Sequence, residues 1–263
     1  MNAKRLLYYV PALVMVGVLL WAPSTMLAQG GSDPQVLPPD SHPFGLTYGE
    51  WAGRFWQWAF SLPPTHNPGF GTADCSAGQS GPVWFLGGAF CGSVGTTAFP
   101  CVTNVVRSCE IPEGKSLLVS SFSDEDSFIE EKVGTSEATL RSNAKSVTDQ
   151  CSGTVTVDGE PVKPVRVCSS GSTCSHVQAP LYRYRLPSPP IPYDNVLAAV
   201  GEYLYNNSAN GLIPNGLSSE GVADGYFVLL APLRVGQHTI DTAYSCPAFG
   251  SSMNQTVHLT VVP

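Results

Sequence analysis

The sequence predicts a mostly β fold, a β-sandwich or jelly-roll-like domain with two or three peripheral helices, stapled by disulfides. Glycine and proline are both abundant, with 26 and 23 residues among 263, which favours turns and short strands over long helices. The last segment, residues 255–262, alternates apolar and polar side chains as a half-buried strand does. All eight cysteines follow an N-terminal export signal, which is typical of a disulfide-stapled domain.

The composition indicates a folded domain and excludes some partners. Apolar residues make up 43% of the chain, enough to form a buried core, whereas charged residues make up only 13%. The formal net charge is −7, and no stretch concentrates lysine and arginine. Because phosphate binding needs a basic surface, we expect neither a nucleic-acid partner nor attachment to an anionic membrane.

Residues 1–28 have the pattern of a secretory signal peptide. Lys4 and Arg5 form a basic start, residues 6–22 are almost wholly apolar, and Ala28 is a small residue suited to the cleavage site. Cleavage after Ser24 is an alternative. An uncleaved anchor is another, since the apolar run reaches the lower limit of a membrane span.

Cleavage would give a secreted protein, periplasmic or extracellular, with no stable membrane insertion. We expect residues 29–45 to form a flexible Gly/Pro-rich leader. Residues 46–263 should then form a single β-rich globular domain.

The even number of cysteines in an exported chain predicts disulfides. Many pairings are open, and the preferred set nests one bridge inside another and ties the middle of the chain to its last hairpin. The preferred pairs are Cys75–Cys109, Cys91–Cys101, Cys168–Cys174 and Cys151–Cys246. A zinc site at Cys168, Cys174 and His176 is the alternative, although the spacing of its cysteines is wider than usual.

The first helix is predicted at residues 47–60. Thr47 and Glu50 form a capping box, and prolines follow the end of the segment. Trp51 and Trp58 lie on one face of this helix together with other apolar side chains, so we expect that face to pack on the β core. Trp56 lies on another face and is the better candidate to contact a partner.

The remaining segments are expected to be mostly strands. We predict strands at residues 83–86, 115–122, 226–230, 237–244 and 255–262, and a helix at 136–148. Residues 154–157 and 162–167 should form a hairpin around Asp158-Gly159, a pair suited to a type I′ turn. Pro161 and Pro164 mark its second arm as an edge strand. Asp194 is expected to cap a short helix that reaches about Tyr205.

Three stretches together resemble an uncharacterised family of bacterial proteins that carry signal peptides. The first is YGEWAGRFWQW at residues 48–58, followed by Asn67-Pro68. The second is QSGPVWFLG at 79–87 with Cys75 and CEIPEGK at 109–115, and the third is ADGYFVLLAPLRVGQHTI at 223–240. The resemblance implies export and one conserved unit, but no reaction. The C-terminal hairpin is also similar to the end of immunoglobulin-like sandwiches.

A serine-hydrolase site is poorly supported by the sequence. Ser80 lies in Gly78-Gln-Ser-Gly81, but Pro82 stands where a nucleophile elbow needs glycine. His238 is the best candidate base, although a half-buried histidine within a strand is ordinary. The chain has no Gly-rich phosphate loop, H-E-x-x-H motif or dinucleotide fingerprint.

The acidic segment is the candidate ion site. Asp124, Glu125 and Asp126 are followed by Glu130 and Glu131, and hard cations such as calcium take clustered oxygens. The alternative is a solvated acidic loop, because the EF-hand spacing is absent. A glycosidase pair is disfavoured, since neighbours in sequence rarely flank one bond. Calcium is therefore the one cofactor that the sequence suggests.

Aromatic residues are the candidate contacts for a ligand. Trp56, Tyr182 and Tyr184 are candidates for exposed surfaces on which sugars or other ligands stack, with core packing as the alternative. The preferred hypothesis is an exported, non-catalytic domain that binds a ligand or a protein or glycan partner, or forms part of a surface structure. The alternative is a secreted hydrolase that acts on a polymer or an ester.

Overall fold

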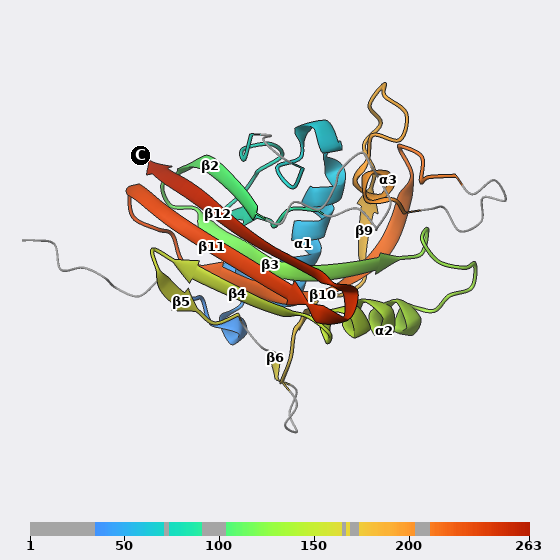
Figure 1. Cartoon of the computed structure of the whole chain (residues 1–263), viewed down its shortest axis with the longest axis horizontal. Coiled ribbons are helices and arrows are strands. Elements are labelled where there is room, and N and C mark those ends of the chain that lie inside the picture. Colours follow the sequence, from blue (N-terminus) through green and yellow to red (C-terminus); the bar gives the residue numbers. More distant parts are fainter. Residues whose placement is uncertain (1–34, 71–73, 91–103, 165–166, 169–173, 203–210) are drawn as a thin grey trace, which may run out of the picture. The chain divides into compact units, whose positions relative to one another are not determined.

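The computed structural model describes residues 35–70, 74–90, 104–164, 167–168, 174–202 and 211–263, and it is a two-sheet β structure with helices on one sheet (Figure 1). This agrees with the mostly β fold predicted from the sequence. The signal segment, Cys91 and Cys101 lie outside the described residues, and so do the side chains of Cys168 and Cys174.

The first sheet, sheet A, is built around two long neighbouring strands. Its order is β1 (Val83–Leu86), β3 (Ser116–Ser127), β10 (Ser218–Leu230) and then β8 (Val177–Gln178) and β9 (Tyr182–Arg185), which both pair with β10. β1 runs parallel to β3, and the other neighbours are antiparallel. β3 and β10 are each several residues longer than predicted.

In the second sheet, sheet B, the C-terminal strand lies between two neighbours. Its order is β2 (Asn104–Pro112), β12 (Ser251–Val262), β11 (Gly236–Cys246), β4 (Ser152–Val157) and β5 (Glu160–Val162). β2 is parallel to β12 and the other pairs are antiparallel. β6 (Val167–Cys168) and β7 (Cys174–Ser175) form a separate ribbon. β2 and β9 were not predicted, because their polar side chains give no clear apolar run.

Sheet A is buried on both faces, which explains its continuous apolar segments. Along β3, Leu117 belongs to the core shared with sheet B, whereas Leu118 belongs to the core shared with the helices. Val228 and Leu229 of β10 divide in the same way. Because successive side chains on a strand point to opposite faces, one strand supplies both cores.

Helix α1 (Tyr48–Ser61) begins with the predicted capping box of Thr47 and Glu50. It is buried on nearly all sides, so the expectation that Trp56 lies on a free face is wrong: its exposure is 6%, like that of Trp58. Trp51 and Trp58 pack in the core as predicted, and their indole nitrogens donate to the carbonyls of Pro43 and Ala77.

The remaining helices are shorter than α1. α2 (Glu137–Thr148) starts at the N-cap Ser136 and packs against β3 and β10. α3 (Val196–Val200) is capped by Asn195 and not by Asp194 as expected, because Asn195 Oδ1 accepts from the Ala198 amide at 3.0 Å. It ends at Gly201, which has a φ of 91°. Four 3-10 turns are η1 (Pro39–Ser41), η2 (Pro43–Gly45), η3 (Pro64–His66) and η4 (Pro247–Phe249).

The described part of the expected leader, residues 35–45, contacts sheet A, and its flexibility stays a prediction. Val36 forms a β-bridge with Leu230, and the Leu37 amide donates to the Leu229 carbonyl at 2.8 Å. The Tyr48 hydroxyl donates to the Leu37 carbonyl at 2.6 Å. The leader is docked because it carries two apolar side chains that extend the cores of sheet A.

Two of the expected disulfides are present. Disulfides join Cys75 to Cys109 and Cys151 to Cys246, which are two of the preferred pairings. The hairpin turn also forms, since Asp158 and Gly159 have φ values of 53° and 85°, as a type I′ turn requires. β5 lies at the edge of sheet B. No helix among the described residues is long and apolar enough to cross a bilayer.

Candidate functional site

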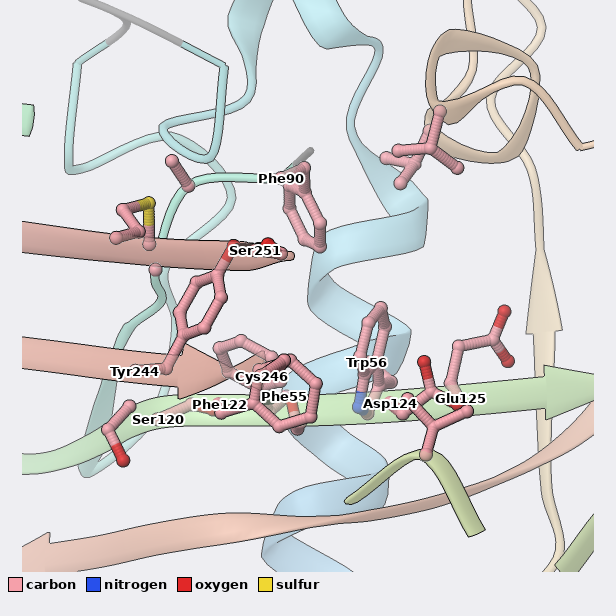
Figure 2. Close-up of a pocket in the computed structure, with 18 of the residues that line it drawn as sticks. Phe55, Trp56, Phe90, Ser120, Phe122, Asp124, Glu125, Tyr244, Cys246 and Ser251 are labelled. Atoms are coloured by element: carbon pink, nitrogen blue, oxygen red, sulfur yellow. Dashed lines mark hydrogen bonds between the residues drawn. The ribbon is translucent and has the colours of Figure 1, made fainter. Parts of the chain in front are cut away.

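A cavity of about 410 Å³ lies beside the part of β3 that β1 leaves unpaired (Figure 2). β1 ends at Leu86, so its register with β3 covers only residues 116–119. From Ser120 onward, this edge of β3 has no strand neighbour among the described residues. α1, α3, residues 88–90 and the turn between β11 and β12 supply the other walls.

Most of the wall is apolar and aromatic. Phe55, Trp56 and Phe60 come from α1, and Phe90 follows β1. Trp56 contacts the rings of Phe60 and Phe90 with centroid distances of 5.3 and 5.8 Å. Aromatic side chains whose positions are fixed by such packing form a preorganised surface for the apolar part of a ligand.

One end of the cavity is acidic. The carboxyl groups of Asp124, Glu125, Glu130 and Glu202 line it, and no lysine, arginine or histidine does so among the described residues. The expected solvated loop is therefore wrong for residues 124–126, which lie in β3. They form a strand because β10 pairs with them throughout, for example Asp224 with Asp124.

The pKa values of these carboxyls are raised, mainly by burial. Burial and the nearby charges of Asp126, Glu202 and Asp224 raise the pKa of Asp124 to about 8. Burial, with the charge of Glu202 as a further cause, raises the pKa of Glu130 to about 8. No basic group among the described residues lies in the cavity to offset these effects, so the acidic end holds protons at neutral pH.

Two further carboxyls show the same direction. Burial, followed by the neighbouring Glu130 carboxyl, raises the pKa of Glu125 well above its usual range. Burial raises the pKa of Asp126 to about 6, although Asn143 on α2 opposes this by donating to its carboxylate at 2.8 Å. Asp126 is thus the carboxyl of this group with the clearest partner.

The indole of Trp56 is an unused donor in the cavity. It is 6% exposed, and its Nε1 has no hydrogen-bond partner among the described residues. Figure 2 shows its nitrogen end directed toward the part of β3 that carries Asp124. The Ser121 hydroxyl, which also lines the cavity, is buried without a partner in the same part of the chain. Buried polar groups are usually satisfied, so these two indicate a ligand or water.

Tyr182 and Tyr184 are buried, so the expectation of exposed stacking surfaces is wrong for them. They point to the same side of β9, where the Tyr182 hydroxyl donates to Glu125 at 3.4 Å. The Tyr184 hydroxyl lies 2.7 Å from that of Ser127. Burial raises the pKa of both tyrosines, so they stay protonated. Their hydroxyls contact Glu125 and Ser127 next to the acidic end of the cavity.

The described residues offer no group of three or more His, Cys, Asp or Glu side chains arranged to hold a metal ion. Asp124 and Asp126 share a face of β3, whereas Glu125 points to the other face, so the three carboxyls do not converge. Calcium binding at Asp124, Glu125 and Asp126 stays a prediction.

The two histidines that the sequence suggested as candidates have structural partners. His238 uses both ring nitrogens, one with Asp158 at 2.7 Å and one with the Arg234 carbonyl at 2.9 Å. Ser80 is exposed in the turn before β1. His176 is buried, and its Nδ1 pairs with Asp224 at 2.9 Å.

Sequence reasoning missed the cavity itself and Glu202. The signal that was available is the run from Ser120 to Ser127, which continues an apolar strand with mostly polar residues and without a glycine or proline. A strand that changes from apolar to polar while it stays paired must carry polar groups into the interior.

No protein-family model and no curated protein matches the chain. Among solved structures, a chain of PbICP-C in complex with falcipain-2 aligns at 12% identity and a TM-score of 0.22, over 69% of this chain and 100% of that one. The cysteine protease inhibitor EhICP2 from Entamoeba histolytica aligns at 11% identity and a TM-score of 0.17, over 59% of this chain and 93% of that one. At these TM-scores neither likeness supports a shared fold or function. The resemblance to signal-bearing bacterial proteins stays a prediction.

Proposed function

We propose that this protein is an exported binding domain that holds a small polar ligand in the cavity beside β3. The observation that carries this proposal is the buried indole N–H of Trp56, which has no partner among the described residues in a cavity lined by carboxyls and aromatic rings. The cavity volume of about 410 Å³ lies within the range of ligand sites in proteins. The walls come from several elements of one core, so the cavity is preformed.

Export is supported by the N-terminal signal pattern and by the disulfides Cys75–Cys109 and Cys151–Cys246, which are typical of an oxidising compartment. N-terminal sequencing of the protein from a secreting host tests this part. We expect a mature chain that begins after Ala28 or after Ser24. A chain that retains Lys4 and Arg5 would mean that the segment is an anchor.

A thermal-shift screen of sugars, amines, amino acids and short peptides tests the binding function. A ligand should raise the melting temperature of the wild type, and Trp56→Phe should reduce that rise, because phenylalanine keeps the packing and removes the donor. Trp84→Phe is the matched control, since Trp84 Nε1 is also buried and unpartnered among the described residues but lies in the core between the sheets. An equal reduction by both variants would place the ligand elsewhere.

A secreted hydrolase is the second candidate. Carboxyls with raised pKa values in a cavity are suited to general acid catalysis at neutral pH, and Asp124 and Glu130 both have a pKa of about 8. A hydrolase substrate screen separates the two functions. Turnover that Glu130→Gln abolishes without loss of folding would favour the enzyme, whereas binding without turnover favours the binding domain.

A further inference from the structure

The contents of the cavity restrict the chemistry of its ligand. Four carboxyls and no basic side chain line it among the described residues, so an anionic ligand would find no counter-charge there. A ligand with a positive charge would instead gain counter-charges, because its charge favours the ionised form of the carboxyls. It would also meet the faces of Phe55, Phe60 and Phe90, which attract cations and pack against C–H groups.

The same ligand must also accept a hydrogen bond. The Trp56 indole is a donor only, and its buried Nε1 has no partner among the described residues. An ammonium group cannot satisfy it, because ammonium has no lone pair. An oxygen close to the ammonium group is therefore required, and a hydroxyl fits best because it can also donate to a carboxylate.

Resting on the binding function proposed above, we infer that the cavity takes an amino sugar, a polyhydroxylated ring that carries a free amine. Its ammonium group lies at the acidic end of the cavity, which Asp124 and Glu130 line. A hydroxyl oxygen accepts from the Trp56 indole, and a C–H face of the ring packs on the aromatic wall. The cavity size suits one such ring with some water, since about 410 Å³ is near the lower end for ligand sites.

Binding of the amine should release protons. In the empty cavity the carboxyls keep their protons near neutral pH, because burial and like charges raise the pKa values of Asp124 and Glu130 to about 8. An ammonium group at hydrogen-bond distance favours the ionised carboxylate and lowers those pKa values. Titration calorimetry in two buffers of different ionisation enthalpy measures the protons released. A neutral sugar would release none.

Glucosamine, N-acetylglucosamine and glucose are the probes, because they share one ring and differ in the free amine. The readout is the indole N–H signal of Trp56 in proton–nitrogen NMR spectra, assigned with Trp56→Phe. The indole signal of Trp84 serves as an internal control outside the cavity. We expect glucosamine to shift the Trp56 signal and to bind about tenfold more tightly than glucose or N-acetylglucosamine.

Variants separate this inference from the broader function. Asp124→Asn and Glu130→Gln should each weaken glucosamine binding about tenfold, whereas Glu160→Gln, on the exposed part of β5, should have no effect. Equal affinity for glucose and glucosamine would overturn the amino-sugar inference while the cavity remained a ligand site. No shift of the Trp56 signal with glucosamine would overturn the inference too. If no compound of the wider screen shifted that signal either, the proposed function would fail with it.

Discussion

The substitution Asp124→Asn should stabilise the protein, and should do so more at high pH than at low pH. Asp124 lines the cavity, and the charges of Asp126, Glu202 and Asp224 add to burial in raising its pKa. Its pKa is raised from 3.8 to about 8. A neutral amide of the same shape removes the cost of a carboxyl that folding keeps away from water and places near like charges.

The sign follows from proton binding in the two states. Below about pH 4 the carboxyl is protonated in both the folded and the unfolded chain, so the substitution has little effect there. Between about pH 4 and pH 8 the unfolded chain releases this proton and the folded chain keeps it, so the stability of the wild type falls as pH rises. Above the pKa of the folded state, the stability that this retained proton provides at lower pH is fully lost.

The magnitude is bounded by the two pKa values. The folded and unfolded pKa values of Asp124 differ by about four. This difference corresponds to a free energy of unfolding that is lower by about 5–6 kcal/mol at high pH than at low pH. Because Asp124 keeps partial contact with solvent in the cavity, screening reduces this, and we expect a gain of about 1–3 kcal/mol near pH 8. For a chain of this size that gain raises the melting temperature by about 2–4 °C per kcal/mol.

Urea unfolding of the disulfide-intact protein at about pH 5 and about pH 8 is the assay. Glu160→Gln is the control, since Glu160 is exposed on β5 and outside the cavity. A gain of the same size at both pH values would mean that the effect is packing and not ionisation. A loss of stability near pH 8 would mean that Asp124 has a favourable partner and that the electrostatic argument is wrong.

Three structural predictions test other parts of the fold. Trp58→Ala should cost about 3–5 kcal/mol by thermal or urea unfolding, through a core cavity and a lost hydrogen bond, and more than Trp56→Phe; the reverse order would refute the packing of α1. Replacing Cys151 and Cys246 by serine should cost about 4 kcal/mol, because their bridge closes a loop with a separation of 95, and an unchanged unfolding midpoint would contradict this. Thr47→Ala should cost about 1 kcal/mol of stability through loss of the capping box. Unfolding followed by far-UV circular dichroism measures this, and an unchanged stability would contradict it.

The elements with strong local signals were predictable from the sequence. The capping box of α1, the Asp158-Gly159 turn and the alternating final strand each depend on neighbouring residues, and all three form. β2 was not predictable, because much of it is exposed and it takes its place by parallel pairing with β12, far along the chain. A local pattern carries no information about such a partner.

The candidate site depended on tertiary packing even more strongly. The acidic segment looked like a loop because strands rarely contain consecutive carboxyls, yet pairing with β10 keeps residues 124–126 in a strand. Trp56 looked like the free face of a helix with one apolar stripe, but sheet A and residues 88–90 bury the helix on other sides. Helical periodicity identifies one buried face and cannot show that a second element covers the opposite face.

The position of the acidic residues is costly, and this supports a functional origin for them. Carboxyls without basic partners destabilise a folded interior, and a neutral side chain at Asp124 or Glu130 would remove that cost. The same end of the cavity leaves the Trp56 indole without an acceptor among the described residues, which is a second unfavourable feature within one site. These carboxyls and the indole line one cavity at the place where β1 ends and β3 continues. A ligand that carries a positive charge and an acceptor oxygen would make both features favourable at once, because it would neutralise the carboxyls and satisfy the indole.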